Sequence, residues 1–172
     1  RNHFEGTEHD PYTNGLNGQE SWRPISVFRT YEAHVMQVRP ELPQEIGEVT
    51  YVGLGMADLT AFVPYYSGLK AYPQHYGIGS NQADSDSIYW KYRKLQTLVM
   101  TDYPKLAPIV KKAYQEWEAK TALEQKEMEA KYLTMVKTDK AGANKMLNEF
   151  NLRVMADAEK LTENLMNELF TV

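Results

Sequence analysis

Residues 147–169, LNEFNLRVMADAEKLTENLMNEL, carry the clearest structural signal in this chain of 172 residues. Apolar side chains recur there at steps of three and four residues, the spacing that places them on one face of an α-helix. They are Leu147, Phe150, Val154, Ala158, Leu161, Leu165 and Leu169. Thr138 and Asp139 upstream can cap the first turn. A coiled coil would show systematic charges beside this stripe, which are missing, so packing in a core is favoured.

Two further helices are expected before this one. Asp84-Ser85-Asp86-Ser87 offers capping oxygens ahead of apolar residues at helical spacing, and Pro104 stops that run. The next helix should begin at Pro104 or Pro108, where a missing N–H costs little, and continue towards Val136. Residues 84–172 are therefore predicted to be the helical part of one domain.

The chain upstream of the helices favours strands. Residues 25–39 are rich in β-branched and aromatic side chains of both parities, so we expect a strand covered on both faces. EVTYVGLGM at 48–56 predicts a second strand of an antiparallel hairpin, with Gly53 and Gly55 marking a bulge or a close backbone approach. The aromatic, turn-forming stretch at 57–83 predicts an ordered loop that completes the 25–83 region.

Residues 1–24 are rich in Gly, Pro and polar side chains, which predicts a loop. The order of loop, strand, strand, loop and three helices makes the fold class α+β. Hydrophobic residues form 42% of the chain, enough for one core. A starting residue other than Met suggests to us a truncated protein.

Composition also excludes several classes of partner and of chemistry. The net charge is −4 and the lysines are interleaved with glutamates, so nucleic acid is not an expected partner. No apolar run approaches the roughly 20 residues that span a bilayer, so we expect no membrane partner and take the cytoplasm as the default compartment. The chain has no cysteine, which excludes disulfides, thiolate metal sites and thiol chemistry within it.

The sequence contains none of the common motifs for zinc binding, phosphate binding or serine hydrolysis. The four histidines, His3, His9, His34 and His75, lack the spacing of a zinc site. No phosphate loop and no serine elbow is present, so neither a cofactor nor a metal is expected. Asp84, Asp86 and Asp102 could act as paired carboxylates, although capping alone explains two of them.

Three arginines flank the first expected strand, at Arg23, Arg29 and Arg39. An arginine in a sheet covered on both faces must find a carboxylate or carbonyl partner. The partner could be structural, in Glu32 or Glu48, or it could be a substrate, and the residues leave both readings open.

Six stretches of the sequence resemble one enzyme family. They are NHFEGT at 2–7, DPY at 10–12, RPISVFRT at 23–30, TYVGLGMAD at 50–58, FVPYY at 62–66 and DSDSIYWK at 84–91. They are similar to the later part of the dipeptidases of lactic-acid bacteria and their relatives, and the resemblance covers essentially the whole chain. These enzymes are cysteine N-terminal-nucleophile hydrolases, related to penicillin V acylase and bile salt hydrolase.

The resemblance implies an αββα sandwich of two antiparallel sheets between helical layers. It implies that a cysteine at the mature amino terminus attacks the amide carbonyl of a dipeptide, with its own α-amino group as general base and without a cofactor or metal. By the same resemblance Asn2 helps to bind the oxyanion, and Arg23 helps to orient the nucleophile. The nucleophilic cysteine itself is absent from these residues.

We therefore expect an inactive carboxy-terminal fragment of a dipeptidase, which self-associates through its strands or pairs with a missing amino-terminal segment. Two alternatives remain open. One is a scaffolding module built on the helices at 104–170, which would expose their apolar stripe where an enzyme fragment would bury it against its own strands. The other is an amidase of the same fold that acts on another acyl amide.

Overall fold

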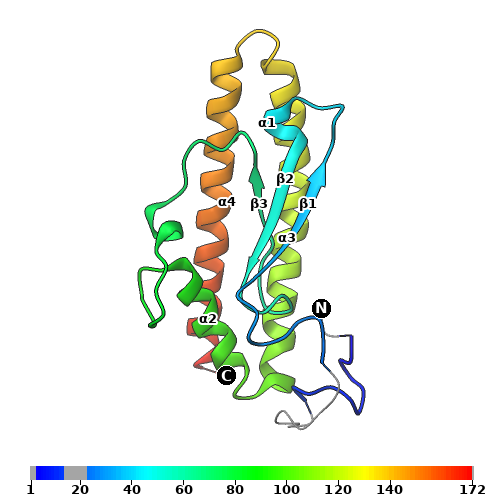
Figure 1. The fold of residues 1–172 in the computed structure, drawn as a ribbon, viewed down its shortest axis with the longest axis vertical. Coiled ribbons are helices and arrows are strands. Elements are labelled where there is room, and N and C mark those ends of the chain that lie inside the picture. The colour runs from blue at the N-terminus through cyan, green and yellow to red at the C-terminus, as the bar shows by residue number, and fades with distance from the viewer. Residues whose placement is uncertain (1–2, 14–22, 172) are drawn as a thin grey trace.

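The computed structural model describes residues 3–13 and 23–171. It is an α+β unit in which a three-stranded antiparallel sheet lies along a long helical hairpin (Figure 1). The elements, in chain order, are β1 Glu32–Val38, α1 Gln44–Gly47, β2 Glu48–Leu54, β3 Val63–Tyr66, the 3-10 helix η1 Gln74–Gly77, α2 Ile88–Val99, α3 Tyr103–Met135 and α4 Lys140–Leu169. The predicted class and the three helices are confirmed.

The hairpin of α3 and α4 packs against the sheet. Leu147, Val154 and Ala158 of the predicted stripe are at most 1% exposed. The ring of Phe150 on α4 meets the ring of Tyr66 on β3 with a centroid separation of 6.4 Å. The stripe is therefore buried against the chain's own strands, which is the arrangement expected of an enzyme fragment and not of a scaffold that displays its helices.

The start of α4 is capped as predicted. Asp139 occupies the N-cap, and its Oδ1 accepts a hydrogen bond of 2.8 Å from the backbone N–H of Gly142. By contrast, Ser87 at the N-cap of α2 makes no side-chain capping bond, because its hydroxyl donates to the carbonyl of Ile78. The predicted capping role of the 84–87 segment is therefore wrong at Ser87.

The cap of α4 gives a first prediction. Asp139→Ala removes a capping bond, so we expect the free energy of unfolding to fall by about 1 kcal/mol in urea denaturation followed by circular dichroism. Asp157→Ala, a change at a partly exposed position within the same helix, is the control and should stay within about 0.5 kcal/mol of the parent. Equal losses in the two variants would contradict the role of the cap.

The predicted hairpin is confirmed, with Met36 opposite Thr50 and β2 also paired to β3. β3 falls inside the stretch predicted to be a loop, because four residues containing Pro64 give too weak a strand pattern. The expectation that both faces of the first strand are covered is wrong for this chain. β1 is an edge strand, and Val35 and Met36 are 57% and 70% exposed.

The first strand is also shorter than predicted, because the backbone N–H and C=O groups of the residues before it already make other hydrogen bonds. The Tyr12 hydroxyl accepts from the N–H of Phe28 and donates to the carbonyl of Ser26. Turn bonds link Val27 to the carbonyl of Ile25 and Thr30 to that of Val27. These groups are not free for a strand ladder, so β1 begins only at Glu32.

Gly55 marks the close backbone approach that the sequence predicts. Its φ is +76°, and a Cβ added there would overlap the side-chain amide of Gln96 on α2. Gln96 is fully buried and holds the turn after β2: its Oε1 accepts from the N–H of Met56, and its Nε2 donates to the carbonyls of Leu54 and Leu59. The close contact between Gly55 and the Gln96 side chain thus joins the sheet to α2.

The two faces of the sheet differ. Tyr51 and Tyr66 reach α3 through hydrogen bonds to Gln125 and Glu129. Because side chains alternate along a strand, Val52 and Tyr65 lie on the opposite face. They border a hollow of about 300 Å³ with aromatic side chains of the following loop and α2. Within the described residues, no helix carries an apolar stretch long enough to cross a membrane.

Candidate functional site

A partly buried polar cluster joins the amino-terminal segment to α3. We define this Lys111 cluster as Glu5, Asp58, Tyr103 and Lys111. The Lys111 ammonium lies 2.6 Å from Oδ2 of Asp58 and also pairs with Glu5. The Tyr103 hydroxyl donates to the same Asp58 oxygen at 2.9 Å. The side chains of Asp58 and Lys111 are only 3% and 12% exposed, so this ion pair is largely desolvated.

The environment shifts the pKa values of Lys111 and Tyr103. Burial alone would lower the pKa of Lys111, but its hydrogen bonds to Asp58, Glu5 and Tyr103 outweigh that effect and hold the pKa above its ordinary value. Burial raises the pKa of Tyr103. At neutral pH Lys111 is therefore a cation and Tyr103 a neutral phenol. Neither can act as a general base, which needs a pKa near the working pH, so the cluster is suited to holding segments in place.

Further contacts tie the loop at 23–30 to the same place. The hydroxyl of Ser26, which is fully buried, accepts from the N–H of Asp58 at 2.8 Å. Arg93 of α2 donates to the carbonyl of Phe28 and stacks its guanidinium 3.9 Å from the centroid of that ring. The rings of Tyr12 and Tyr103 are 5.3 Å apart. The two amino-terminal loops and the start of the helical hairpin therefore form one packed unit.

The two predicted site residues have different outcomes. Asn2 lies outside the described residues. Arg23 is exposed at the start of the 23–30 loop, and its positive charge is a minor influence that opposes the burial-driven rise in the pKa of Tyr12. Arg39 lies elsewhere: it bonds Glu129 of α3 and not Glu32 or Glu48, so the suggested structural partners were wrong. Arg39, which follows β1, and Arg23, in the amino-terminal loop, therefore contact different parts of the molecule.

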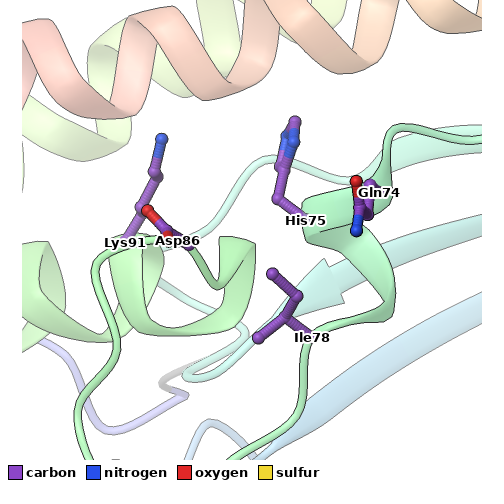
Figure 2. Close-up of a pocket in the computed structure, with 5 residues that line it drawn as sticks. All are labelled: Gln74, His75, Ile78, Asp86 and Lys91. Carbon is purple, nitrogen blue, oxygen red and sulfur yellow. The ribbon is translucent and has the colours of Figure 1, made fainter.

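A second polar region opens between η1, α2 and α4. It is a pocket of about 380 Å³ lined by Gln74, His75, Ile78, Asp86 and Lys91. Figure 2 shows Lys91 and His75 both pointing towards α4 across this space, with Ile78 below them. Every residue that lines the pocket except Ile78 has a polar side chain.

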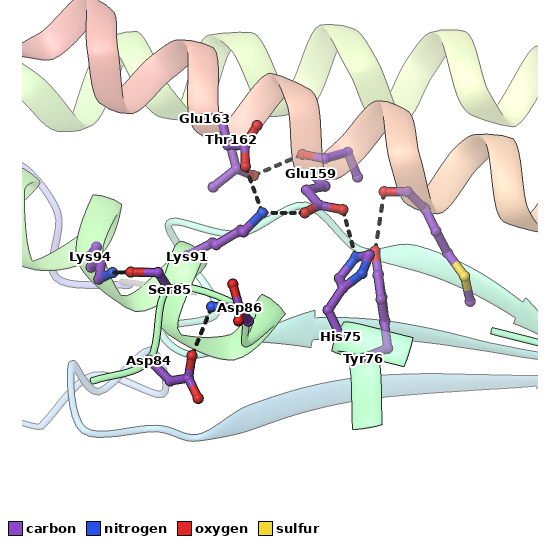
Figure 3. A network of polar contacts seen from close by, with 12 residues as sticks. His75, Tyr76, Asp84, Ser85, Asp86, Lys91, Lys94, Glu159, Thr162 and Glu163 are labelled. Carbon is purple, nitrogen blue, oxygen red and sulfur yellow. Dashed lines mark hydrogen bonds and ion pairs between the residues drawn. The ribbon is translucent and has the colours of Figure 1, made fainter. Parts of the chain in front are cut away.

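Two of the lining residues, His75 and Lys91, pair with carboxylates of α4 (Figure 3). Glu159 contacts two side chains: its Oε2 lies 2.8 Å from Nε2 of His75, and its Oε1 lies 2.5 Å from Nζ of Lys91. Lys91 also pairs with Glu163 at 2.7 Å. Burial works against the charge of Lys91, but the two glutamates hold its pKa above the ordinary value. Lys91 is thus a fixed cation whose partners are already present.

Across residues 3–13 and 23–171, no group of three or more His, Cys, Asp or Glu side chains is placed to hold a metal ion. An oxygen of Asp84 accepts a hydrogen bond of 2.8 Å from the backbone N–H of Asp86, a local contact within the segment before α2.

Comparison with known proteins decides the family. A family model described as Peptidase family C69 matches residues 1–116. The chain belongs to peptidase family C69. The match ends within α3, and every residue of the Lys111 cluster lies inside it. The partners Glu159 and Glu163 of the pocket network, by contrast, lie on α4 outside the matched part of this C69 chain.

Relatives of the C69 chain carry dipeptidase names. It is 58% identical over 72 residues to a "Probable dipeptidase" of Salmonella dublin, a match that covers 42% of this chain and 16% of that protein. It is 27% identical over 176 residues to a "Probable dipeptidase" of Latilactobacillus sakei, covering 99% of this chain and 35% of the relative. The "Dipeptidase A" of Lactobacillus helveticus is 25% identical over 169 residues, with 96% and 33% covered. The C69 chain thus spans about a third or less of the length of these relatives.

Sequence reasoning missed the charged partners in both regions. Lys111 falls in the helix predicted from 104 towards Val136 and Asp58 in a family motif, and their neighbours do not indicate which charges would pair. Lys111 and Glu5 are 106 residues apart, and Lys91 and Glu159 are 68 residues apart. One usable signal existed in the C69 chain: a lysine at a helical position that the apolar spacing places near the buried face should be paired.

Proposed function

We propose that this chain is the carboxy-terminal part of a bacterial dipeptidase whose nucleophile is a cysteine outside these residues. The observation that carries the proposal is the family match over residues 1–116, together with relatives named dipeptidases. Burial of the helical stripe against the chain's own strands also favours an enzyme part over a scaffold. The whole protein would take dipeptides and release free amino acids.

The proposed chemistry is acyl transfer to sulfur. The cysteine sulfur attacks the peptide carbonyl carbon, its proton passes to the cysteine's own α-amino group, and the carbonyl oxygen becomes an oxyanion. Collapse expels the carboxy-terminal amino acid, whose nitrogen takes the proton, and leaves a thioester. Water then releases the first amino acid and restores the thiol. Asn2 would donate to the oxyanion, and Arg23 would orient the nucleophile.

The proposed fold of the whole enzyme is the αββα sandwich of N-terminal-nucleophile hydrolases. The present sheet would be one of the two sheets, and α3 and α4 would be the helical layer on its outer face. The opposite face, with Val52 and Tyr65, would face the second sheet. The exposed edge at β1 would pair with further strands, either of the remaining protein or of a second copy, because an open edge presents unpaired N–H and C=O groups.

The proposal is tested with the full-length protein, its cysteine-to-alanine variant, and the isolated 172-residue chain. Free amino acids released from a panel of dipeptides are measured by chromatography. We expect turnover by the full-length protein alone. Dipeptide turnover by the pure isolated chain would overturn the missing-nucleophile proposal. A full-length enzyme that ignores dipeptides but cleaves penicillin V or a conjugated bile salt would favour the amidase alternative.

A further inference from the structure

β1 ends the sheet with a row of backbone groups that face away from β2. The strand order is β1-β2-β3, so β2 lies on one side of β1 only. Across residues 3–13 and 23–171, no other strand pairs with β1. Figure 1 shows β1 at the side of the sheet away from β3. An open edge of this kind is a template for another strand.

Two hydrogen bonds show which residues of β1 turn their backbone groups outward. The N–H of Arg39 donates to the carbonyl of Gly47 at 2.8 Å, and the N–H of Gly55 donates to the carbonyl of Tyr31 at 2.7 Å. In an antiparallel pair only alternate residues bond the neighbouring strand. The odd-numbered residues of β1 therefore bond β2, and the even-numbered residues present their N–H and C=O groups to the open side. These outward residues are Glu32, His34, Met36 and Val38.

β1 lacks the features that keep an edge strand from pairing. Natural edges carry lysines, prolines or bulges. The sequence of β1, EAHVMQV, has neither Lys nor Pro, and its register against β2 runs without a bulge from Glu32 to Val38. The carboxylate of Glu32 lies 2.7 Å from Nδ1 of His34. Val35 on one face, and Met36 and Val38 on the other, are more than half exposed. The edge is therefore suited to pairing with another strand.

The length of the relatives favours a strand of the same polypeptide as the partner. The C69 chain spans only 35% and 33% of the two relatives that it matches almost from end to end, so about two thirds of each lies outside the match. A second copy joined through β1 would contribute seven residues, whereas a stable interface takes about 20 to 30 residues a side. A strand in the same protein needs no such area, because tethering gives it a high effective concentration.

We infer that the β1 edge is an intramolecular docking line, at which a strand of the whole protein from outside residues 1–172 bonds the four outward residues. The inference rests on the proposed function, which supplies the longer protein, and it selects the remaining protein over a second copy as the partner of this edge. The docked strand carries apolar side chains on both faces, because it continues the exposed faces at Val35 and Met36. In the whole protein β1 is thus an interior strand.

Hydrogen exchange of the full-length protein, resolved to single amides, tests the pairing. With the edge filled, the amides of the outward residues should exchange at least about 100-fold more slowly than in an unfolded peptide, as should the inward amides of Ala33, Val35 and Gln37. The inward amides are the internal control, because they bond β2 in either case. An open edge would instead give an alternation, with His34 and Met36 exchanging fast and their neighbours slowly. That alternation would overturn the inference.

Two proline variants of the full-length protein give a second readout. Met36→Pro removes an outward N–H, and Val35→Pro removes an N–H that bonds β2. Proline is tolerated on an edge strand where the missing N–H faces water, so an open edge predicts a much smaller loss of Tm in Met36→Pro. We expect losses of similar size, and a much smaller loss in Met36→Pro would overturn the inference. If neither variant folds, the exchange pattern of the parent protein decides.

Dilution followed by sedimentation identifies the chain that supplies the strand. A strand of the same polypeptide protects the outward amides equally in the monomer and at every dilution. Protection that disappears when the protein dissociates to monomers would show that a second copy fills the edge, and would overturn the inference. If the full-length protein did not cleave dipeptides, the proposed function would fail and the exchange test would stand. An open edge in an active dipeptidase would overturn this inference alone.

Discussion

Replacing Gln96 with methionine is expected to lower the free energy of unfolding by about 3 to 6 kcal/mol. The side chain keeps a similar length but loses every hydrogen bond to the turn after β2. The N–H of Met56 and the carbonyls of Leu54 and Leu59 are then left without their partner. Each buried backbone group that loses its partner costs about 1–3 kcal/mol. Urea denaturation followed by circular dichroism measures the loss.

The matched control for this change is Gln125→Met. Gln125 is also a buried helical glutamine, but it bonds the hydroxyl of Tyr51 on β2 and no backbone group. A hydroxyl can turn towards another partner, so we expect a loss of about 1 kcal/mol. Equal losses in the two variants would mean that burial of an amide, and not the turn at Gly55, determines the effect.

Replacing Glu129 with leucine is expected to cost about 3 to 5 kcal/mol, because it leaves a half-buried guanidinium without its carboxylate. Arg39 donates to both oxygens of Glu129 at 2.7 Å, and Tyr66 donates to one of them at 2.5 Å. In the wild-type chain the hydrogen bonds to Glu129 raise the pKa of Arg39. An arginine guanidinium keeps its proton in proteins even without this partner, so the variant leaves an unpaired positive charge. The bidentate pair joins the end of β1 to α3.

A double-mutant cycle tests this reading. Arg39→Met together with Glu129→Leu should lose less than the sum of the single variants, because the pair then leaves no unpaired charge. The exposed pair Lys145 and Glu149 on α4 is the control, and Lys145→Ala should change stability by less than about 1 kcal/mol. Strict additivity at Arg39 and Glu129 would show that the two residues act independently.

The candidate site was only partly predictable. The family resemblance predicted Asn2 and Arg23 as site residues. The structure describes only Arg23, which is an exposed loop residue close enough to Tyr12 to influence its pKa. The motif residue Asp58 gained a role that its sequence neighbours do not reveal, as the buried partner of Lys111 and Tyr103. A motif marks residues that belong together in a family, but it does not say which of them touch.

The sequence by itself determined the helices, the β1 to β2 hairpin, the cap at Asp139 and the close backbone approach at Gly55. These features depend on periodicity, capping and backbone freedom within a few residues, so neighbouring residues suffice to predict them. Only the tertiary structure decided that β1 is an exposed edge, that Arg39 pairs with Glu129, and that Lys111 joins Glu5 to Asp58. Such pairs form between distant segments because packing of the hairpin on the sheet removes them from water together, and no local pattern encodes which charges will meet.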